Sequence, residues 1–204
     1  MKPLFTLLVL LLTNAAFSQA ALTAKFTFTK KPPNVALIYF EDGKETPEAN
    51  TKVDQKNQAF DKKLYVAKSG GEISFVNSDN IDHNIYADDK ATGIKFDKGL
   101  GNPGSSFKQK VEWGAGKVIK IGCMIHPKMK SYVASLNTKY FKIVEFDRSK
   151  KEHTVKMDGL PPEVKQLKVW MPKYNEVSVE LSSGTKTAEL KRKGKSRGSL
   201  ELTR

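Results

Sequence analysis

Residues 119–129 read Ile-Lys-Ile-Gly-Cys-Met-Ile-His-Pro-Lys-Met. The first of them alternate as in a β-strand, and a second alternating stretch begins at Tyr132, so a tight loop should join two neighbouring strands. Within that loop Cys123, His126 and Met129 stand at the spacing C-x2-H-x2-M. We therefore expect a thiol, an imidazole and a thioether to project from one short loop.

The same short alternation recurs along the chain, and helical periodicity is almost absent. Turn-forming segments such as 69–71, 99–104 and 114–116 separate the alternating stretches. Many short strands with frequent turns predict an all-β fold, a sandwich or a barrel. A polar segment at 45–60 lacks this pattern, and we expect a long loop there with room for a short helix over 53–59. The expected strands lie at 26–29, 73–76, 118–121, 132–136, 141–146, 154–157, 168–171, 177–181 and 187–190.

The N-terminus has the three parts of a secretory signal peptide. Lys2 is followed by an uncharged, Leu-rich run at 3–17, and then by Ser-Gln-Ala-Ala at 18–21. The run is short for a bilayer-spanning helix and no stop-transfer segment follows, so we expect cleavage after Ala20 and no membrane span. The mature protein should then be periplasmic or secreted. An uncleaved anchor is the alternative.

A charged stretch without apolar residues, Asp-Arg-Ser-Lys-Lys-Glu at 147–152, separates two groups of expected strands. We therefore divide the chain into a signal peptide at 1–20, a larger β domain at 21–147 and a small β module at 148–204 with a basic tail. About fifty residues are marginal for an independent core. The module should therefore pack against the first domain, and borrowing the early strand around 23–30 is one way to do so. Nothing in the sequence indicates an oligomeric state.

The chain is basic, with 35 Lys and Arg against 22 Asp and Glu and a formal net charge of +13. Lysines are scattered through every segment, and the densest run is Lys-Arg-Lys-Gly-Lys-Ser-Arg at 191–197. Such a run can attract nucleic acid or an acidic surface. Because the run has no interleaved aromatic residues and no recognition helix, we do not expect nucleic-acid binding. An acidic partner protein and a simply solvated tail remain.

Cys123 is the one cysteine of the chain. Exported proteins usually carry cysteines in pairs, since their compartment oxidises thiols. An unpaired thiol is therefore a liability unless a bound group occupies it, and an inert buried Cys is the plain alternative. His126 and Met129 beside it favour the bound group.

The donor types in this loop select among metals. Thiolate and thioether are soft donors that suit copper, and imidazole suits it as well. Two His and one Cys in a plane with a weak axial Met form the blue-copper electron-transfer sites. Zinc would require a further strong ligand, c-type haem a Cys-x-x-Cys-His motif, and an iron–sulfur cluster several cysteines. One copper ion per chain, cycling between Cu(I) and Cu(II), is therefore the expected cofactor.

A second imidazole is available upstream. His83 follows the expected strand 73–76, within Asn-Ser-Asp-Asn-Ile-Asp-His-Asn-Ile-Tyr at 77–86. A single His in a polar loop is usually just exposed, so spacing alone does not make it a ligand. Met124 is expected to pack rather than to bind metal, and His153 stands in the charged linker without a partner pattern.

Together these two segments resemble the cupredoxin family, the group of plastocyanin, pseudoazurin and amicyanin. The resemblance covers about 54–141. Residues 75–77 leading to His83 and Asn84 are similar to that family's first-ligand loop, and 123–129 to its short amicyanin-type ligand loop.

The resemblance implies a Greek-key β-sandwich that holds a type 1 copper site. Asn84 would provide a hydrogen bond that ties the two ligand loops together. The ligand set that it implies is His83, Cys123, His126 and Met129.

Beyond this core the chain is similar to a bacterial group labelled methylamine-utilisation-like proteins. In that group a cupredoxin domain is joined to a small carboxypeptidase-regulatory-like β module. One departure is that this chain has Pro162-Glu163 where the group tends to have Pro-Gly. The likeness is carried by 54–60, 123–126, 139–141, 160–162 and 169–170.

The resemblance also implies that the exposed edge of His126 passes the electron and that Pro127 beside it forms an apolar contact. Lys120, Lys128 and Lys130 around it favour an acidic redox partner through long-range attraction. The expected function is an exported, mononuclear copper protein that transfers single electrons between redox partners.

Three other functions remain to be weighed. A periplasmic copper carrier or resistance protein would use the same ligands, and the sequence does not separate it from an electron shuttle. A multicopper enzyme would require further His clusters, which His153 alone cannot supply, so we do not expect an enzyme. A purely structural or adhesive β protein would leave the four-ligand combination unexplained.

Overall fold

The structure, a computed structural model, describes residues 20–40, 47, 51–160 and 164–204. Every regular element in these ranges is a β-strand, which confirms the predicted all-β fold. The strands are β1 Ala20–Phe28, β2 Val35–Tyr39, β3 Thr51–Lys56, β4 Ala59–Phe60, β5 Tyr65–Lys68, β6 Glu72–Asn77, β7 His83–Asp89, β8 Ile94–Gly101, β9 Ser106–Lys110, β10 Val118–Gly122, β11 Lys130–Leu136, β12 Phe141–Glu145, β13 Glu152–Leu160, β14 Gln166–Trp170, β15 Val177–Glu180, β16 Thr185–Arg192 and β17 Lys195–Thr203.

The helix expected over 53–59 is wrong. Strands β3 and β4 occupy this segment as a hairpin whose two turn residues, Asn57 and Gln58, both have φ of 52°. Left-handed conformations at both positions are those of a type I′ turn, whose twist matches that of the flanking strands. The sequence of this segment did not predict a strand because only Val53 and Gln55 of β3 are buried, and Gln55 is polar. Part of the long loop expected at 45–60 lies outside the described residues.

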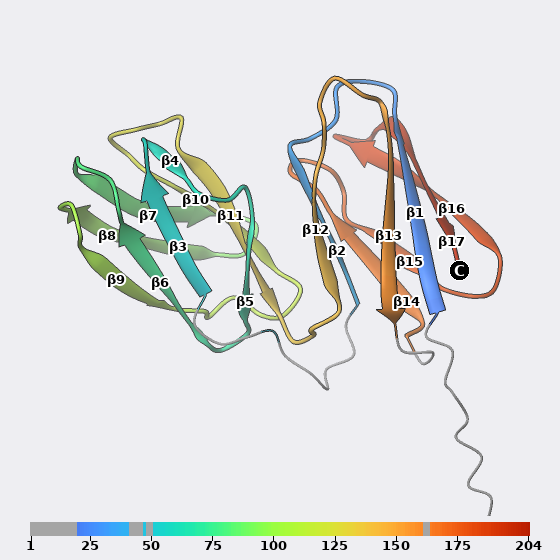
Figure 1. Cartoon of the computed structure of the whole chain (residues 1–204), viewed down its shortest axis with the longest axis horizontal. Coiled ribbons are helices and arrows are strands. Elements are labelled where there is room, and N and C mark those ends of the chain that lie inside the picture. Colours follow the sequence, from blue (N-terminus) through green and yellow to red (C-terminus); the bar gives the residue numbers. More distant parts are fainter. Residues whose placement is uncertain (1–19, 41–46, 48–50, 161–163) are drawn as a thin grey trace, which may run out of the picture.

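The strands form four sheets that pair into two sandwiches (Figure 1). In the first sandwich a sheet of order β4-β3-β6-β9 faces a sheet of order β5-β11-β10-β7-β8. Alternate side chains of strands such as β6 point inward, as expected for a sheet with one buried face. The core between them includes Val53, Phe75, Ile85, Ile121 and Val133. Successive strands cross between the two sheets, which is the Greek-key arrangement.

The second sandwich combines the start and the end of the chain. β1 pairs with β13 on one side and β17 on the other, in the sheet β13-β1-β17-β16. The early strand expected around 23–30 thus lies among the C-terminal strands. The facing sheet has the order β12-β2-β14-β15, and its strands β2 and β12 precede residue 147. The division of the chain into domains at that residue stays a prediction.

Strand β2 is buried along its whole length because it contacts both sandwiches. Ala36 and Ile38 belong to the core of the second sandwich, whereas Val35, Leu37 and Tyr39 pack with residues of β11. At the edge of this junction the rings of Tyr132 and Trp170 meet edge to face, with centroids 4.9 Å apart. An apolar layer therefore joins the two sandwiches.

The topology also decides where the two candidate ligand loops lie. The loop at 78–82 leads into β7, and the loop at 123–129 follows β10. β7 and β10 are antiparallel neighbours, and Gly122 at the end of β10 stands opposite Tyr86. The beginning of β7 and the end of β10 therefore lie at the same end of the first sandwich. No helix within the described ranges is long and apolar enough to span a membrane.

Candidate metal centre

The structure brings His83, Cys123 and His126 together at this end of the sandwich. The Nδ1 atoms of His83 and His126 are 3.0 Å apart. The Sγ atom of Cys123 lies 3.9 Å from Nδ1 of His83 and 3.7 Å from Nδ1 of His126. Three soft or borderline donors, separated by 43 residues of chain at most, thus converge on one point.

The size of this triangle can be compared with a metal ion. A point at equal distance from the three donor atoms would lie about 2.1 Å from each of them, and metal–nitrogen and metal–sulfur bonds at such sites are about 2.0 and 2.3 Å long. The three donor atoms are therefore spaced so that they would hold a single metal ion. Two imidazoles and one thiolate in a plane are the donor set of a mononuclear blue-copper site.

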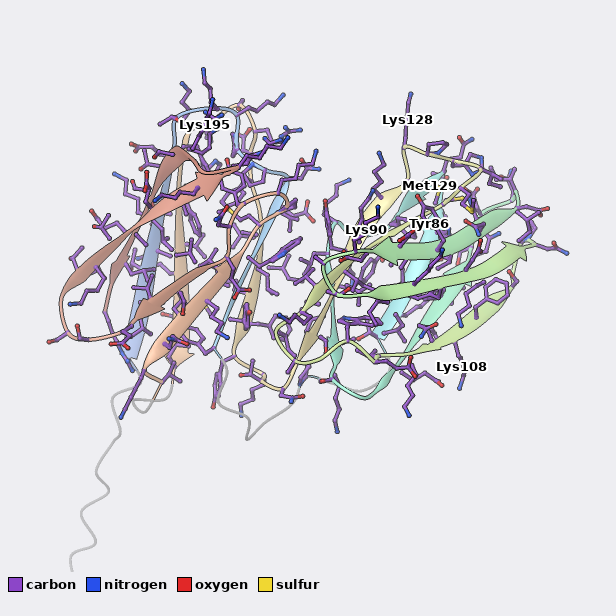
Figure 2. The ribbon with its side chains drawn as sticks, turned by 180° about the vertical axis from the view of Figure 1, so that it is seen from behind. Tyr86, Lys90, Lys108, Lys128, Met129 and Lys195 are labelled. Carbon is purple, nitrogen blue, oxygen red and sulfur yellow. The ribbon has the colours of Figure 1, made fainter. Side chains whose placement is uncertain are left out.

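Met129, the fourth predicted ligand, is buried in the same apolar cluster as Cys123. Its backbone N–H donates to the carbonyl of His126 at 2.8 Å, so the ligand loop closes into a tight turn just before β11. Figure 2 shows Met129 at the same end of the first sandwich as Lys128. Met124 differs from expectation, because it is 60 % exposed and does not pack in the interior.

Asp79 is a residue of this centre that the sequence reasoning missed. Its Oδ2 lies 2.9 Å from Nε2 of His83, on the side of the ring opposite the donor Nδ1. The same oxygen accepts the Gln58 N–H at 2.7 Å, and Oδ1 accepts the Asn80 N–H. The Gln58 hydrogen bond, followed by the one from His83, lowers the pKa of the Asp79 carboxyl to about 2. The carboxylate therefore accepts a hydrogen bond from Nε2–H of His83, which keeps the ring proton on Nε2 and leaves Nδ1 as the unprotonated nitrogen that a metal requires.

Asn84 provides the connection between the two loops that the resemblance implied. Its side-chain Oδ1 accepts the Met124 N–H at 2.9 Å, and its backbone N–H donates to Sγ of Cys123 at 3.4 Å. The side-chain amide donates in turn to Asp97. Gln55 donates to the backbone carbonyl of Asn84 at 3.2 Å. Both the sulfur and the loop that carries it are therefore fixed to the start of β7.

The loop before His83 is held from the inside by Asn77. The buried Asn77 amide donates to the carbonyls of Ile81 at 2.8 Å and Gly101 at 2.9 Å, and its Oδ1 accepts the Asp79 N–H at 3.0 Å. Because these bonds engage both ends of the loop, Asp79 and His83 are positioned together. Such an outer layer of hydrogen bonds orients metal ligands and resists their movement.

The rim of the centre carries exposed apolar side chains. His83 and Cys123 are buried, whereas His126 is partly exposed and is the member of the cluster that reaches the surface. Met124 and Ile125 in the ligand loop are 60 % and 49 % exposed, and Leu100, opposite Asn84 across β7 and β8, is 60 % exposed. Lys128 projects from the same end of the molecule (Figure 2). Lys128 in the ligand loop, Lys130 at the start of β11 and Lys120 in β10 are exposed.

His153 takes no part in this centre. Its ring packs edge to face against Phe146, with centroids 4.8 Å apart, and its Nε2 lies 3.3 Å from the Lys150 carbonyl. His153 therefore belongs to the second sandwich, where it lies in β13 and not in the charged linker expected from the sequence. Among the described residues, the cluster of His83, Cys123 and His126 is the one group of three or more His, Cys, Asp or Glu that could hold a metal.

Comparison with known proteins gives structural neighbours only. No protein-family model and no curated protein sequence matches the chain. A purple cupredoxin from Nitrosopumilus maritimus is similar over 43 % of this chain and 99 % of its own, with 22 % identity and a TM-score of 0.36. A reduced amicyanin variant is similar over 54 % and 98 %, with 16 % identity and a TM-score of 0.38.

A copper-containing nitrite reductase from Thermus scotoductus SA-01 is similar over 43 % of this chain, with 19 % identity and a TM-score of 0.38. Only 22 % of the reductase chain is covered. The likeness to these three structures concerns the sandwich architecture, and the chemistry of the centre rests on the donor geometry given above.

Proposed function

We propose that this protein is an exported, mononuclear copper protein that transfers single electrons, with His83, Cys123, His126 and Met129 as ligands of a type 1 site. The observation that carries the proposal is the triangle of two Nδ1 atoms and one Sγ atom around a space of ionic size. Copper in such a site would supply a one-electron couple between Cu(I) and Cu(II).

The chain contributes a rigid arrangement of donors. Three of the proposed ligands sit on one loop between paired strands, and the fourth is tied to that loop through Asn84. Asp79 holds the ring of His83 from behind, and Asn77 fixes the loop that leads to His83. Ligands that are fixed in this way move little when charge changes at the centre, and a small reorganisation favours rapid electron transfer.

Electron entry and exit are proposed at the partly exposed imidazole of His126. The apolar residues Met124, Ile125 and Leu100 around it can exclude water from a brief contact. Lys120, Lys128 and Lys130 would attract an acidic redox partner over a distance and speed the encounter. A small apolar contact with a charged rim fits the weak, short-lived complexes of redox proteins.

The proposal includes export and a narrower family. Residues 1–19 lie outside the described structure, and their sequence supports a cleaved leader and a periplasmic or secreted protein. The β-sandwich that the C-terminal strands form with β1 and β2 supports the assignment to the methylamine-utilisation-like group with its carboxypeptidase-regulatory-like module. Mass spectrometry of the protein recovered from the periplasm would show whether the chain begins at Ala21.

Spectroscopy of the mature protein tests the site. After loading with one equivalent of Cu(II), we expect an intense thiolate-to-copper absorption in the visible range and an EPR signal of a single copper ion. Cys123→Ser should abolish the absorption, whereas Met124→Leu, a change at an exposed neighbour, should leave it in place. A colourless protein that prefers zinc would overturn the assignment.

A competition experiment separates a shuttle from a copper carrier. The buried Cys123 and Met129 and the hydrogen-bonded His83 favour retention of the ion through many redox cycles. We therefore expect reversible one-electron voltammetry and slow loss of Cu(I) to an excess of a strong chelator. Transfer of Cu(I) to the chelator within seconds, without fast self-exchange, would instead identify a carrier.

A further inference from the structure

A hollow of about 260 Å³ lies at the junction of the two sandwiches, away from the metal ligands. Its charged lining consists of Lys31, Arg148, Lys173 and Arg192, and two aromatic residues, Tyr132 and Tyr174, complete the principal walls. Tyr132 comes from β11 of the first sandwich, and the other five come from the second. No carboxylate lines this junction hollow.

The four cations come from four separate segments that the fold brings together, and only Arg192 belongs to the basic run at 191–197. Lys31 lies in the connection from β1 to β2, Arg148 between β12 and β13, Lys173 between β14 and β15, and Arg192 at the end of β16. In the part of the chain that the structure describes, none of the four has a carboxylate within ion-pair distance. Four like charges gathered without a counter-charge repel one another, and an anion between them would relieve that repulsion.

Two of the cations have defined positions: a hydrogen bond orients the side chain of Arg148, and Lys173 occupies a strained backbone conformation. Arg148 donates through Nε to the Pro32 carbonyl at 3.1 Å, which orients its guanidinium. Lys173 has φ of 69° in the turn that Tyr174 closes by donating to the Met171 carbonyl at 3.1 Å. This position of a turn normally takes glycine, and a side chain there is strained. A lysine kept in a glycine position points to a use for its charge.

Tyr132 and Tyr174 line the hollow together with the four cations. Burial raises the pKa of the Tyr174 phenol, and the positive charges of Arg192 and Arg197 oppose that rise. Tyr174 and Arg192 both line the hollow. The ring of Tyr132 is fixed edge to face against Trp170, with centroids 4.9 Å apart. Two phenol O–H groups can thus complement the cations as neutral hydrogen-bond donors.

We propose that the junction hollow binds a ligand through its oxyanion groups, either phosphate or carboxylate. Two guanidinium groups offer the planar, paired N–H donors that match these anions, and the two ammonium groups add charge without a fixed geometry. A hollow of about 260 Å³ falls just below the usual range for drug-sized ligands, so it suits one small anion or the acidic side chains of a partner.

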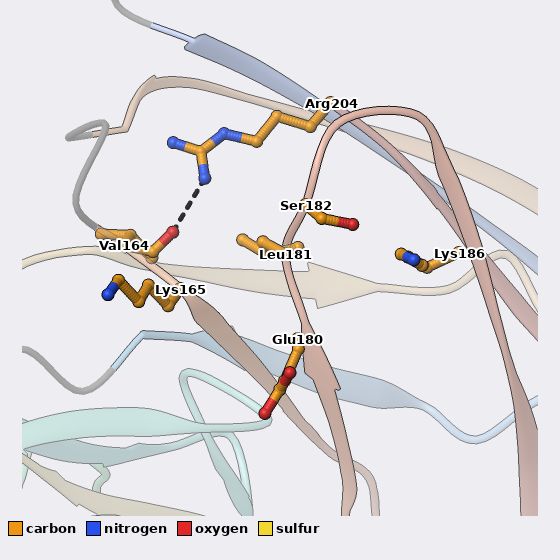
Figure 3. A pocket seen from close by; sticks show the side chains of 7 residues that line it. All are labelled: Val164, Lys165, Glu180, Leu181, Ser182, Lys186 and Arg204. Carbon is orange, nitrogen blue, oxygen red and sulfur yellow. Dashed lines mark hydrogen bonds between the residues drawn. The ribbon is translucent and has the colours of Figure 1, made fainter.

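A second basic hollow, of about 440 Å³, provides a contrast within the same molecule (Figure 3). Lys165, Lys186 and Arg204 line it, but so does the carboxylate of Glu180. Arg204 donates through Nη1 to the Val164 carbonyl at 2.8 Å. This hollow has its own negative charge, so the loss of a lysine from it serves as a control for the loss of net positive charge.

A titration of the mature, copper-loaded protein in its reduced form tests the proposal. Inorganic phosphate and citrate are added separately at constant low ionic strength, and backbone amide shifts are followed by NMR. We expect saturable shifts that cluster at residues 31, 34, 132, 148, 173, 174 and 192, which are the hollow's lining residues that carry a backbone N–H. Arg192→Gln should weaken binding at least about tenfold, the loss of one charged hydrogen-bonding group, and Lys186→Gln should leave it within about twofold.

Lys173→Gly keeps the test independent of folding. Glycine relieves the strain at φ of 69°, so we expect thermal stability to be retained or raised while anion binding weakens. Shifts that do not saturate, or equal weakening by Arg192→Gln and Lys186→Gln, would show only diffuse charge and overturn the proposal. Because the readout is the amide shift, this result is independent of the role of the copper centre.

A second titration distinguishes a free small anion from the carboxylates of a partner protein. A short Asp- and Glu-rich peptide is titrated in the same way as the free anions. In Figure 2 the start of β17 at Lys195, which pairs with Arg192, lies at the top of the second sandwich, and Lys128 of the ligand loop lies at the top of the first. Tighter binding of the peptide than of phosphate would assign the hollow to a partner's carboxylates, and the reverse would assign it to a free small anion.

Discussion

Oδ2 of Asp79 lies 2.9 Å from Nε2 of His83, and both side chains are almost fully shielded from solvent, at 8 % and 0 % exposure. A full negative charge thus sits behind the imidazole whose other nitrogen faces the metal position. Hydrogen bonding of this kind raises the basicity of a metal-bound imidazole and fixes its ring. Asp79 is therefore expected to adjust the centre electronically as well as to position it.

Asp79→Asn should raise the reduction potential of the copper centre. A negative charge behind His83 favours Cu(II) over Cu(I), and the amide removes that charge while it keeps the size of the side chain. We expect a rise on the order of 50 mV, which corresponds to about a tenfold change in the ratio of the two affinities. Voltammetry measures it. Asp82→Asn, an exposed change of equal charge in the same loop, should shift the potential much less, and equal shifts would contradict the expectation.

Asn84→Ala should destabilise the first sandwich. The change leaves the Met124 N–H without its acceptor and breaks the side-chain link to Asp97. Because Asn84 is buried, a loss of about 2 kcal/mol in the free energy of unfolding is expected from urea titration. Leu100→Ala, opposite Asn84 in the next strand but exposed, should change stability little. If the two variants unfolded at the same urea concentration, the connection through Asn84 would be unimportant for stability.

How far the sequence predicts this centre depends on the range of each interaction. Cys123, His126 and Met129 share one loop, so their spacing is local information. His83 joins them only because β7 pairs with β10, a long-range contact that the resemblance supplied and the periodicity did not. Asp79 stands four residues before His83 in the sequence, but nothing local shows that its carboxylate meets the ring.

The orientation of Asp79 depends on a segment for which the sequence reading was wrong. The Gln58 N–H that binds the carboxylate comes from the turn between β3 and β4. β3 reads Thr-Lys-Val-Asp-Gln-Lys, with one apolar residue in six, and therefore lacks the alternation of a half-buried strand. Its buried Gln55 replaces an apolar side chain because it donates to the Asn84 carbonyl. Polar residues that serve a site can thus hide the strand that carries them.

Gly198→Ala should destabilise the second sandwich strongly. Gly198 has φ of 147°, and a Cβ atom there would lie 1.9 Å from the Thr27 carbonyl oxygen of the paired strand β1. Since the Cβ is fixed rigidly to the backbone of β17 and the carbonyl belongs to the backbone of β1, the strands must separate, and a loss of about 3 kcal/mol is expected. Gly194→Ala is the matched control, because its φ is 72° but nothing lies within 4 Å of the added atom. A similar loss in both variants would show that conformation, and not the contact with Thr27, decides.

Ile125→Glu should slow electron self-exchange between copper-loaded molecules by about tenfold or more. If two molecules meet through the apolar rim around His126, a carboxylate at the 49 % exposed Ile125 must lose part of its water when the surfaces touch, and the lysines at 128 and 130 offset only part of that cost. The change also lowers the net positive charge, and lower repulsion alone would speed the reaction. The two effects therefore have opposite signs.

Lys108→Gln separates the two effects. Lys108 lies on β9 at the opposite end of the first sandwich from Lys128 (Figure 2), and its loss removes one positive charge without touching the rim. It should leave self-exchange unchanged or slightly faster, as measured from NMR line widths in mixtures of Cu(I) and Cu(II) protein. If Ile125→Glu exchanged as fast as Lys108→Gln, the electron would not pass through the surface around His126, and another face of the sandwich would have to supply the contact.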